Sequence, residues 1–298
     1  MKLLLLGKNG QVGWELQRAL APLGEVIALD RNSRNGLCGN LTDLDGLAAT
    51  LAALKPDVIV NAAAHTAVDK AESETELTHT INALAPGVMA DQACRLGAWL
   101  IHYSTDYVFD GSGEQPWQET DATGPLGVYG ASKLAGEQAI QQSGCQHIIL
   151  RTSWVYAARG NNFAKTMLRL GQERDQLNVI NDQIGSPTGA ELIADVTAHI
   201  IRNIPQQLDV SGIYHLVASG TTSWHNYANF VLDFARNKGI NIKVNADNIN
   251  AVPTSAFPTP AQRPHNSRLN TTKLQSTFNL TLPHWQAGVE RMLTEILS

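Results

Sequence analysis

Tyr129 and Lys133 are the two residues whose types and spacing most directly suggest chemistry. They lie four positions apart in the stretch VYGASKLAGE, residues 128–137, and residues four apart on a helix share one face. The ammonium group of Lys133 would lower the pKa of the Tyr129 phenol and make it a proton carrier. Such pairs also occur on ordinary helix surfaces, so the spacing alone indicates either surface packing or acid–base catalysis.

Polar side chains are expected close to this pair. The stretch HYSTDYVFDG, residues 102–111, spans the end of an apolar strand pattern, and ligands of open parallel sheets bind outside the carboxyl ends of the strands. A hydroxyl group there can hydrogen-bond a carbonyl oxygen while Tyr129 protonates it and Lys133 holds a nicotinamide ribose. This combination predicts hydride transfer to a carbonyl group. The side chains expected to point into the crevice are those of Ser104, Thr105 and Asp106.

A glycine-rich turn at the start of the chain favours dinucleotide binding. GKNGQVG, residues 7–13, lies between an apolar strand pattern and a helical pattern. The three glycines would allow a tight turn, close approach of the backbone to a pyrophosphate, and close packing of helix on strand. A strand–turn–helix without function is the alternative, and no Gly-Lys-Ser/Thr follows to make a P-loop. The residues predicted to line the phosphates are Gly7, Gly10, Gln11, Val12 and Gly13.

Asp30 ends the second strand pattern about 20 residues beyond the glycines, where an acidic side chain binds the adenosine ribose hydroxyls. It favours NADH, because a 2′-phosphate would be repelled. Arg31 and Arg34 could offset that repulsion, so use of NADPH stays open, and a simple turn aspartate is the alternative. Further cofactor contacts are expected from Asn40 and Leu41 beside the adenine, and from Ala62, Ala63 and Ala64, which could equally serve helix–sheet packing.

Strand and helix patterns alternate through the first half of the chain, which predicts an α/β fold with a doubly wound parallel sheet. The second half is less regular and would form a smaller C-terminal substrate domain. We expect a Rossmann-like dinucleotide domain over residues 1–160, joined again by about 190–220, and a mainly substrate-binding domain over 161–298. The predicted strands are 2–7, 25–30, 57–64, 98–104, 147–153, 177–180 and 213–218. The predicted helices are 12–23, 44–54, 75–97, 129–142, 163–171, 190–203, 223–238 and 284–297.

Composition narrows the class of protein. The 298 residues are 43% hydrophobic, and the net charge of −5 with a pI near 6.0 disfavours a nucleic-acid-binding protein. The three cysteines are far apart and show no metal or disulfide spacing. The first apolar run is too short for a signal peptide, and no run reaches the length of a membrane span. These observations predict a soluble, cytoplasmic protein with no membrane or nucleic-acid partner.

The motifs GKNGQVG, STDYVFDG and YGASK resemble those of the extended short-chain dehydrogenase/reductases, which act mostly on nucleotide sugars. The closer likeness is to the dTDP-4-dehydrorhamnose reductase family, and it covers nearly the whole chain. The stretches that carry this likeness are NAAAHTAVDKAE (61–72), RTSWVYA (151–157), GNNFAKTML (160–168), NDQIGSPTGA (181–190) and RPHNSRLN (263–270).

The resemblance implies specific roles. Thr105, Tyr129 and Lys133 would be catalytic, with NAD(P)H reducing the C4 keto group of a dTDP-4-keto-6-deoxy sugar in the synthesis of a cell-surface polysaccharide. Substrate contacts are implied for Thr66, Val68, Ser104, Thr105, Trp154, Asn266 and Arg268. Some members of the family use Mg²⁺ at a contact between two subunits, which would involve Glu15, Glu191 and Glu295 and allow a homodimer. From sequence alone these three are ordinary helix-surface glutamates.

Several alternatives remain. A nucleotide-sugar epimerase uses the same Thr, Tyr and Lys, and a catalytically silent NADP-binding regulatory subunit would share the fold. Dehydratases of the superfamily carry Asp-Glu after the Thr, whereas Tyr107 occupies the second position here. His65 and His102 are predicted to be hydrogen-bonded structural residues, and stacking on a sugar is favoured for Trp154. Arg263 could pair with the substrate diphosphate or lie in a solvated Pro-rich loop, residues 253–268.

Overall fold

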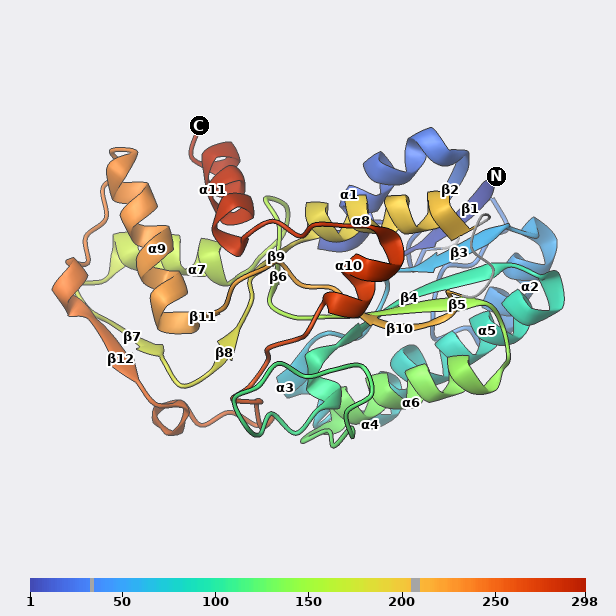
Figure 1. Cartoon of the computed structure of the whole chain (residues 1–298), viewed down its shortest axis with the longest axis horizontal. Coiled ribbons are helices and arrows are strands. Elements are labelled where there is room, and N and C mark those ends of the chain that lie inside the picture. Colours follow the sequence, from blue (N-terminus) through green and yellow to red (C-terminus); the bar gives the residue numbers. More distant parts are fainter. Residues whose placement is uncertain (33–34, 205–209) are drawn as a thin grey trace.

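A six-stranded sheet forms the centre of the computed structural model, which describes residues 1–32, 35–204 and 210–298; Arg34 lies outside these residues. The strand order is β10-β5-β4-β3-β1-β2, and all neighbouring strands run parallel. Figure 1 shows the sheet in the half of the molecule that contains the N-terminus. The strands are β1 (Lys2–Leu6), β2 (Glu25–Leu29), β3 (Val58–Asn61), β4 (Trp99–Thr105), β5 (His147–Thr152) and β10 (Gly212–His215).

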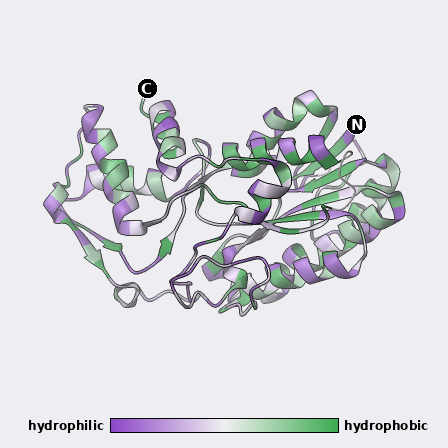
Figure 2. Cartoon of the chain, viewed as in Figure 1, coloured by the Kyte–Doolittle hydropathy of each residue, from purple (hydrophilic) through white to green (hydrophobic). Residues whose placement is uncertain are grey.

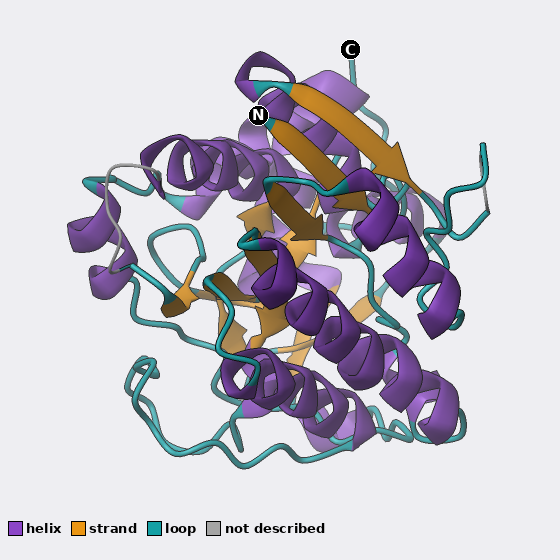
Figure 3. Cartoon of the chain, turned by 90° about the vertical axis from the view of Figure 1, so that its right-hand side faces the viewer, coloured by secondary structure: helices purple, strands orange, loops and turns teal. Residues whose placement is uncertain are grey.

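Both faces of the sheet are buried, as continuous apolar strands require. Leu3 and Leu5 belong to the core on one face, and Leu4 and Leu6 belong to the core on the other. Figures 2 and 3 show apolar strands enclosed between helices. The helices on the first face are α1 (Gln11–Leu20), α8 (Ala190–Asn203) and α10 (Thr272–Phe278); those on the second are α2 (Leu44–Leu54), α5 (Ala85–Leu96) and α6 (Val128–Gln142).

The strand order creates a crevice between β1 and β3. From β1 the chain moves outward to β2, then returns across β1 to place β3 on its other side. Helices leaving the carboxyl ends of β1 and β3 therefore diverge to opposite faces, which is where ligands bind in such sheets. The predicted doubly wound parallel fold is confirmed.

The helix predicted over residues 75–97 is interrupted. It consists of α4 (Thr75–His79), a π-helical turn (Thr80–Leu84) and α5. Pro86 lies in the first turn of α5, directly after the π-helical turn, and has no N–H to donate to the residues before it. The turn matters because the Asn82 side chain binds the backbone of His65 through both its oxygen and its nitrogen, at 2.9 and 3.1 Å, and so ties this segment to the loop after β3.

A second lobe has its own core, built from α7, α9 and α11. Ser223 caps α9 as predicted, because its Oγ accepts from the N–H of Asn226 at 3.1 Å. The pairing of β7 with β12 was not predicted, nor was the return of α10 to the sheet. The remaining elements are α3 (Val68–Ala71), α7 (Phe163–Glu173), α9 (Trp224–Asn237), α11 (Trp285–Ile296), β6 (Val155–Tyr156), β7 (Leu177–Ile180), β8 (Ile184–Gly185), β9 (Thr188–Gly189), β11 (Thr222–Ser223) and β12 (Ile249–Val252).

None of the described helices is both long enough and apolar enough to cross a membrane.

Candidate active site

The glycine-rich turn lies at the mouth of the crevice between β1 and β3. Gly7 has a φ of +87°, and a Cβ there would lie 2.7 Å from the nitrogen of Ala63. A Cβ on Gly13 would lie 2.1 Å from the Gly7 carbonyl oxygen. Gly10 is the N-cap of α1 and has no side chain to cap the helix. The turn therefore presents bare backbone beside the uncapped first N–H groups of α1, which suits a pyrophosphate.

Asp30 follows β2 and is held by the glycine-rich turn itself. Its carboxylate accepts from the Asn32 N–H at 2.8 Å and from Asn9 Nδ2 at 2.9 Å, and Lys8 Nζ lies 3.5 Å away. The Asn32 hydrogen bond is the main reason why the pKa of Asp30 is lowered, and the nearby Lys8 charge adds to it. Asp30 is thus an ionised acceptor beside the crevice. Sequence reasoning missed Lys8 and considered Arg31, which is exposed.

The other residues predicted to bind the cofactor differ in which of their atoms could contact it. Asn40 lies near Asp30, since a Cβ on the adjacent Gly39 would be 2.4 Å from the Asp30 carbonyl oxygen. Leu41 is 5% exposed and packs in the core, so only its backbone can meet a ligand. The remaining residues line the turn or the loop after β3 and are half-buried: Gln11, Val12, Ala62, Ala63 and Ala64.

Close backbone contacts position helix α6, which carries Tyr129 and Lys133. A Cβ on Gly130 would lie 2.2 Å from the Tyr107 carbonyl oxygen, and one on Gly136 would lie 2.2 Å from that of Asn82. Only glycine at these positions lets the helix approach both neighbours so closely. At the helix start, the Glu72 carboxylate accepts from the Val128 N–H at 2.9 Å and supplies the missing cap.

This packing brings Tyr129 to the carboxyl end of β4. Burial raises the pKa of Tyr129, the nearby Asp106 and Tyr107 raise it further, and a hydrogen bond with Thr105 lowers it by less. The Thr105 hydroxyl also donates to Asp106 Oδ1 at 3.1 Å and accepts from the Tyr107 N–H at 3.2 Å. The structure therefore places a phenol and a hydroxyl together at one point of the crevice.

Lys133 lies differently from the sequence-based expectation. It is only 2% exposed, and its Nζ donates to the Tyr103 carbonyl oxygen at 2.6 Å and lies 3.1 Å from His102 Nε2. Burial lowers its pKa to about 8. The prediction that its ammonium group lowers the pKa of Tyr129 is wrong for this structure: burial raises that pKa, and Lys133 does not contribute. The reason is that its Nζ points toward β4 instead of toward the phenol.

The two histidines beside the crevice are hydrogen-bonded, as predicted. His102 Nδ1 lies 3.0 Å from Asn61 Nδ2, and His65 Nε2 lies 2.8 Å from Glu74 Oε2. Burial lowers the pKa of His102 well below its usual value, and the Lys133 charge adds to the effect. His102 is therefore neutral and serves as a buried partner of Lys133.

Trp154 is not an open platform for a sugar. Its φ is +50°, a strained conformation for a large side chain, and its ring stacks on Trp224 with 3.5 Å between centroids. A Cβ on Gly185 would come within 2.7 Å of the same indole. Because Trp224 and Gly185 leave little of the ring surface free, the structure differs from the predicted stacking on a sugar.

The Pro-rich loop contributes fewer free groups than its sequence suggests. Asn266 is 1% exposed, and its amide binds the carbonyl oxygens of Ser112 and Gln115 at 3.2 and 2.8 Å, while Arg268 Nη1 lies 3.0 Å from its Oδ1. These contacts give Asn266 a structural role. Arg263 pairs with Asp69 at 2.7 Å and also approaches Tyr107.

Three hydroxyl groups at the strand ends have no partner among the described residues. They belong to Ser104, which was predicted, and to Thr152 and Ser153, which were not. Thr152 pairs in register with Thr105 on the neighbouring strand. The signal that could have found them is their place directly at the end of a strand pattern. Thr66 is exposed in the loop after β3, and Val68 is half-buried at the start of α3.

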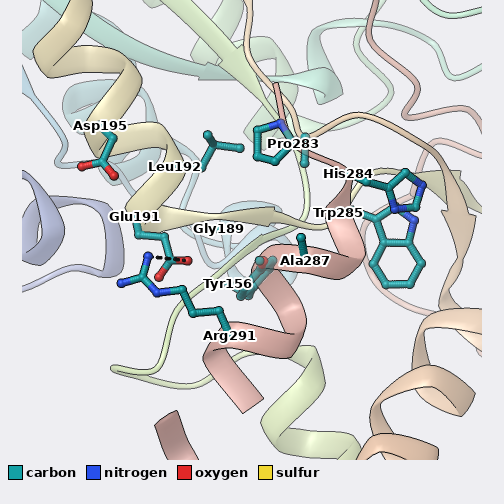
Figure 4. A pocket seen from close by; sticks show the side chains of 12 residues that line it. Tyr156, Gly189, Glu191, Leu192, Asp195, Pro283, His284, Trp285, Ala287 and Arg291 are labelled. Carbon is teal, nitrogen blue, oxygen red and sulfur yellow. Dashed lines mark ion pairs between the residues drawn. The ribbon is translucent and has the colours of Figure 1, made fainter. Parts of the chain in front are cut away.

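The three glutamates considered for Mg²⁺ do not form a metal site within the described part of this chain. Burial raises the pKa of Glu191, the nearby Arg291 lowers it, and Glu15 and Glu295 raise it, so the three carboxylates share one region. However, no group of three or more His, Cys, Asp or Glu among the described residues could hold a metal ion. Glu191 instead pairs with Arg291 at 3.5 Å in a cavity of about 270 Å³ between α8 and α11 (Figure 4).

Comparison with known proteins identifies the family. Residues 1–298 match the family model described as the RmlD substrate binding domain. The chain is 61% identical over 298 residues to the dTDP-4-dehydrorhamnose reductase of Escherichia coli (strain K12), covering 100% of this chain and 99% of that protein. The chain belongs to the dTDP-4-dehydrorhamnose reductase family. This membership confirms the resemblance predicted from the motifs, and with it an oxidoreductase.

Solved structures of the same family have the same fold. The dTDP-4-dehydrorhamnose reductase ortholog of Clostridium acetobutylicum is 34% identical with a TM-score of 0.89, covering 100% of both chains. The reductase of Bacillus anthracis str. Ames, in complex with NADP, is 34% identical with a TM-score of 0.86, covering 99% of both chains.

Proposed function

We propose that this protein reduces the C4 keto group of dTDP-4-dehydrorhamnose with NAD(P)H and releases dTDP-L-rhamnose. The observation that carries the proposal is the meeting of Thr105 and Tyr129 at the end of β4, beside a crevice whose glycine turn leaves backbone free. The family supports the substrate, since the relatives carry this activity in their names. The product would serve the synthesis of a cell-surface polysaccharide.

The residues of the crevice fit a dinucleotide. The first N–H groups of α1, those of Gln11 to Gly13, would hold the pyrophosphate, and Asp30 would accept from the adenosine ribose hydroxyls. Lys133 would hold the nicotinamide ribose once it turns from the Tyr103 carbonyl oxygen. A bound reduced nicotinamide supplies the hydride that C4 receives.

The protein itself supplies the proton and its placement. The Tyr129 hydroxyl would give its proton to O4 as the hydride arrives, and the Thr105 hydroxyl would hold O4 in place by a hydrogen bond. Burial keeps Tyr129 protonated before the reaction, because it raises the pKa of the phenol. Ser104, Thr152 and Ser153 hold further hydroxyls without a partner among the described residues at the ends of β4 and β5.

The test is a cofactor assay. The protein is mixed with dTDP-4-dehydrorhamnose and NADPH, then NADH, and the absorbance of the reduced nicotinamide is followed while the sugar product is identified. We expect one equivalent of cofactor consumed for each dTDP-L-rhamnose formed. An epimerase would form a new sugar without net consumption, and a regulatory subunit would bind NADPH and leave the sugar unchanged; either result would contradict the proposal.

Tyr129→Phe tests the assigned acid. We expect kcat to fall by about 10²–10⁴-fold, the usual worth of general acid catalysis, while NADPH binding largely survives. A matched control is Tyr107→Phe, since Tyr107 lies against Tyr129 at 5.5 Å between ring centroids. Near-normal turnover by Tyr129→Phe would remove it from the acid's role.

The finer features of the proposal rest on the family. We propose a cytoplasmic enzyme that accepts both NADH and NADPH and forms a homodimer, with the acidic region around Glu191 facing the second copy. Sedimentation of the purified protein checks the dimer, and the activity left after removal of divalent cations with EDTA tests whether Mg²⁺ is bound at the contact between two copies.

A further inference from the structure

Asp106 is a buried carboxyl group directly beneath the reaction site. It is 2% exposed, and its Oδ1 accepts from the Thr105 hydroxyl at 3.1 Å. Its Oδ2 has no partner at hydrogen-bonding distance within residues 1–32, 35–204 and 210–298. A buried carboxylate normally finds a cation or several donors, because an uncompensated charge away from water is costly. Asp106 therefore has an unusual environment next to a reactive hydroxyl.

The surroundings of Asp106 favour its neutral form. Burial raises the pKa of Asp106 to about 6, although the nearby Ser267 side chain and the Thr105 hydroxyl lower it. The other titratable groups facing it are Tyr129 on α6 and Tyr107, whose pKa values it raises. Arg263 of the Pro-rich loop pairs with Asp69 and also hydrogen-bonds Tyr107.

The Thr105 hydroxyl can donate to the substrate in only one of the two ionisation states of Asp106. It has a single proton and two acceptor sites, and one of these sites already receives the Tyr107 N–H at 3.2 Å. If Asp106 is a carboxylate, the Thr105 proton points to it. If Asp106 is neutral and the Tyr129 hydroxyl, which also hydrogen-bonds Thr105, is turned to the substrate, the Asp106 proton can occupy the second acceptor site of Thr105. The Thr105 proton then becomes free for another acceptor.

We propose that Asp106 is a positioning residue whose neutral carboxyl donates to Thr105 and so directs the Thr105 proton to the carbonyl oxygen of the substrate. This inference rests on the proposed function. The carboxylate form turns the Thr105 proton away from the substrate, and its negative charge also makes Tyr129 a weaker acid. Both effects lower the rate of the reaction, so reduction slows as pH rises through the ionisation of Asp106. Only hydroxyl and carboxyl protons reorient, and no bond between heavy atoms changes.

The test compares the pH profile of kcat for the wild type and for Asp106→Asn, with substrate and cofactor saturating. An asparagine amide donates to Thr105 at every pH. We expect the wild-type kcat to fall by about tenfold for each pH unit above the pKa of Asp106, and the variant to change by less than about threefold across the same range. A variant profile that falls like the wild type would overturn the proposal.

Asp110→Asn is the matched control. Asp110 lies in the same segment, but it is exposed and its carboxylate accepts from the Ser112 N–H at 2.8 Å. This variant should keep the pH profile of the wild type. A loss of pH dependence in Asp110→Asn as well would show that the effect does not belong to Asp106.

A measurement without turnover separates this inference from the proposed function. Infrared difference spectra of the protein should show the carbonyl band of a protonated carboxyl that disappears as pH rises from 5 to 8, approximately the interval around the raised pKa of Asp106. The band should be missing in Asp106→Asn and present in Asp110→Asn. If the wild type reduces no sugar, the proposed function fails, and the infrared titration still decides here: a band unchanged in Asp106→Asn overturns the role of Asp106.

Discussion

Glu137 and Asp106 are both buried beside the central sheet, yet their surroundings are opposite. Glu137 on α6 is 0% exposed, and its two oxygens accept from Arg151 Nε and Nη2 at 2.9 and 2.6 Å. Asp106 receives the Thr105 hydroxyl at 3.1 Å and lies near the Ser267 side chain, and no cation pairs with it in the described part of the chain. The Glu137 carboxylate therefore joins α6 to β5, whereas the Asp106 carboxyl lies at the candidate active site.

The presence or absence of a cation partner gives a buried carboxyl group one of two roles. A bidentate Arg–carboxylate pair satisfies both oxygens and fixes the geometry of the elements that carry it. A carboxyl without a cation changes its pKa instead, because burial disfavours the charged form. We infer that Glu137 stabilises the position of α6, and hence of Tyr129, whereas Asp106 lowers stability at neutral pH for the sake of the reaction.

The largest expected effect on stability comes from breaking the Glu137–Arg151 pair. Glu137→Gln leaves Arg151 charged and buried without its partner, and we expect the free energy of unfolding to fall by about 3–5 kcal/mol. Urea denaturation at neutral pH measures it. Glu173→Gln is the control: the Arg169–Glu173 pair has the same 2.9 Å separation but is more than half exposed, so its loss should cost less than about 1 kcal/mol. Equal losses in the two variants would contradict the role given to Glu137.

The second prediction is a gain in stability instead of a loss. The pKa of Asp106 is raised from 3.8 to about 6 in the folded protein, so its neutral form adds stability at low pH that is lost as pH rises through about 6. Two pKa units correspond to about 3 kcal/mol. We therefore expect Asp106→Asn to be more stable than the wild type at pH 7.5, by up to about 3 kcal/mol, and to match it near pH 4. Urea denaturation at both pH values checks this, and an Asn variant less stable at pH 7.5 would oppose it.

The smallest effect concerns Asp30, a carboxylate held near solvent. Asp30→Ala should weaken NADH binding by roughly tenfold, the worth of a charge-assisted hydrogen bond, and NADPH binding by less, since the 2′-phosphate no longer meets a negative charge. Titration with each cofactor measures the two affinities. Equal weakening of NADH and NADPH binding would place Asp30 away from the ribose hydroxyls.

Local patterns predicted the fold well because each strand and helix reveals its periodicity in a few residues. The run Leu3–Leu6 predicts a strand buried on both faces, and the structure confirms it. Gly7 and Gly13 were predicted to permit a tight turn and close packing, which their contacts bear out. The interrupted helix near Asn82 and the return of α10 to the sheet were missed, because each depends on contacts between residues distant in the chain.

The site was predicted less completely than the fold. Tyr129 and Thr105 were expected together and lie together, but the direction in which Lys133 points was not predictable from its spacing. Trp154 was expected to be open to a sugar, and only the fold reveals that Trp224 stacks on it. The resemblance implied that Asn266 contacts the substrate, whereas its amide binds the carbonyl oxygens of Ser112 and Gln115 in this structure.

The sequence by itself determined the alternation of strands and helices, the glycines of the turn, and the order in which Thr105, Tyr129 and Lys133 occur. These features are local, because backbone conformation and apolar periodicity act over a few neighbouring residues. Only the tertiary structure decided which buried acid has a cation and which does not. Glu137 and Arg151 are 14 positions apart, and Asp106 meets Tyr129 only through the close approach at Gly130. The pKa of a buried group depends on everything packed around it, and that environment exists only once the chain has folded.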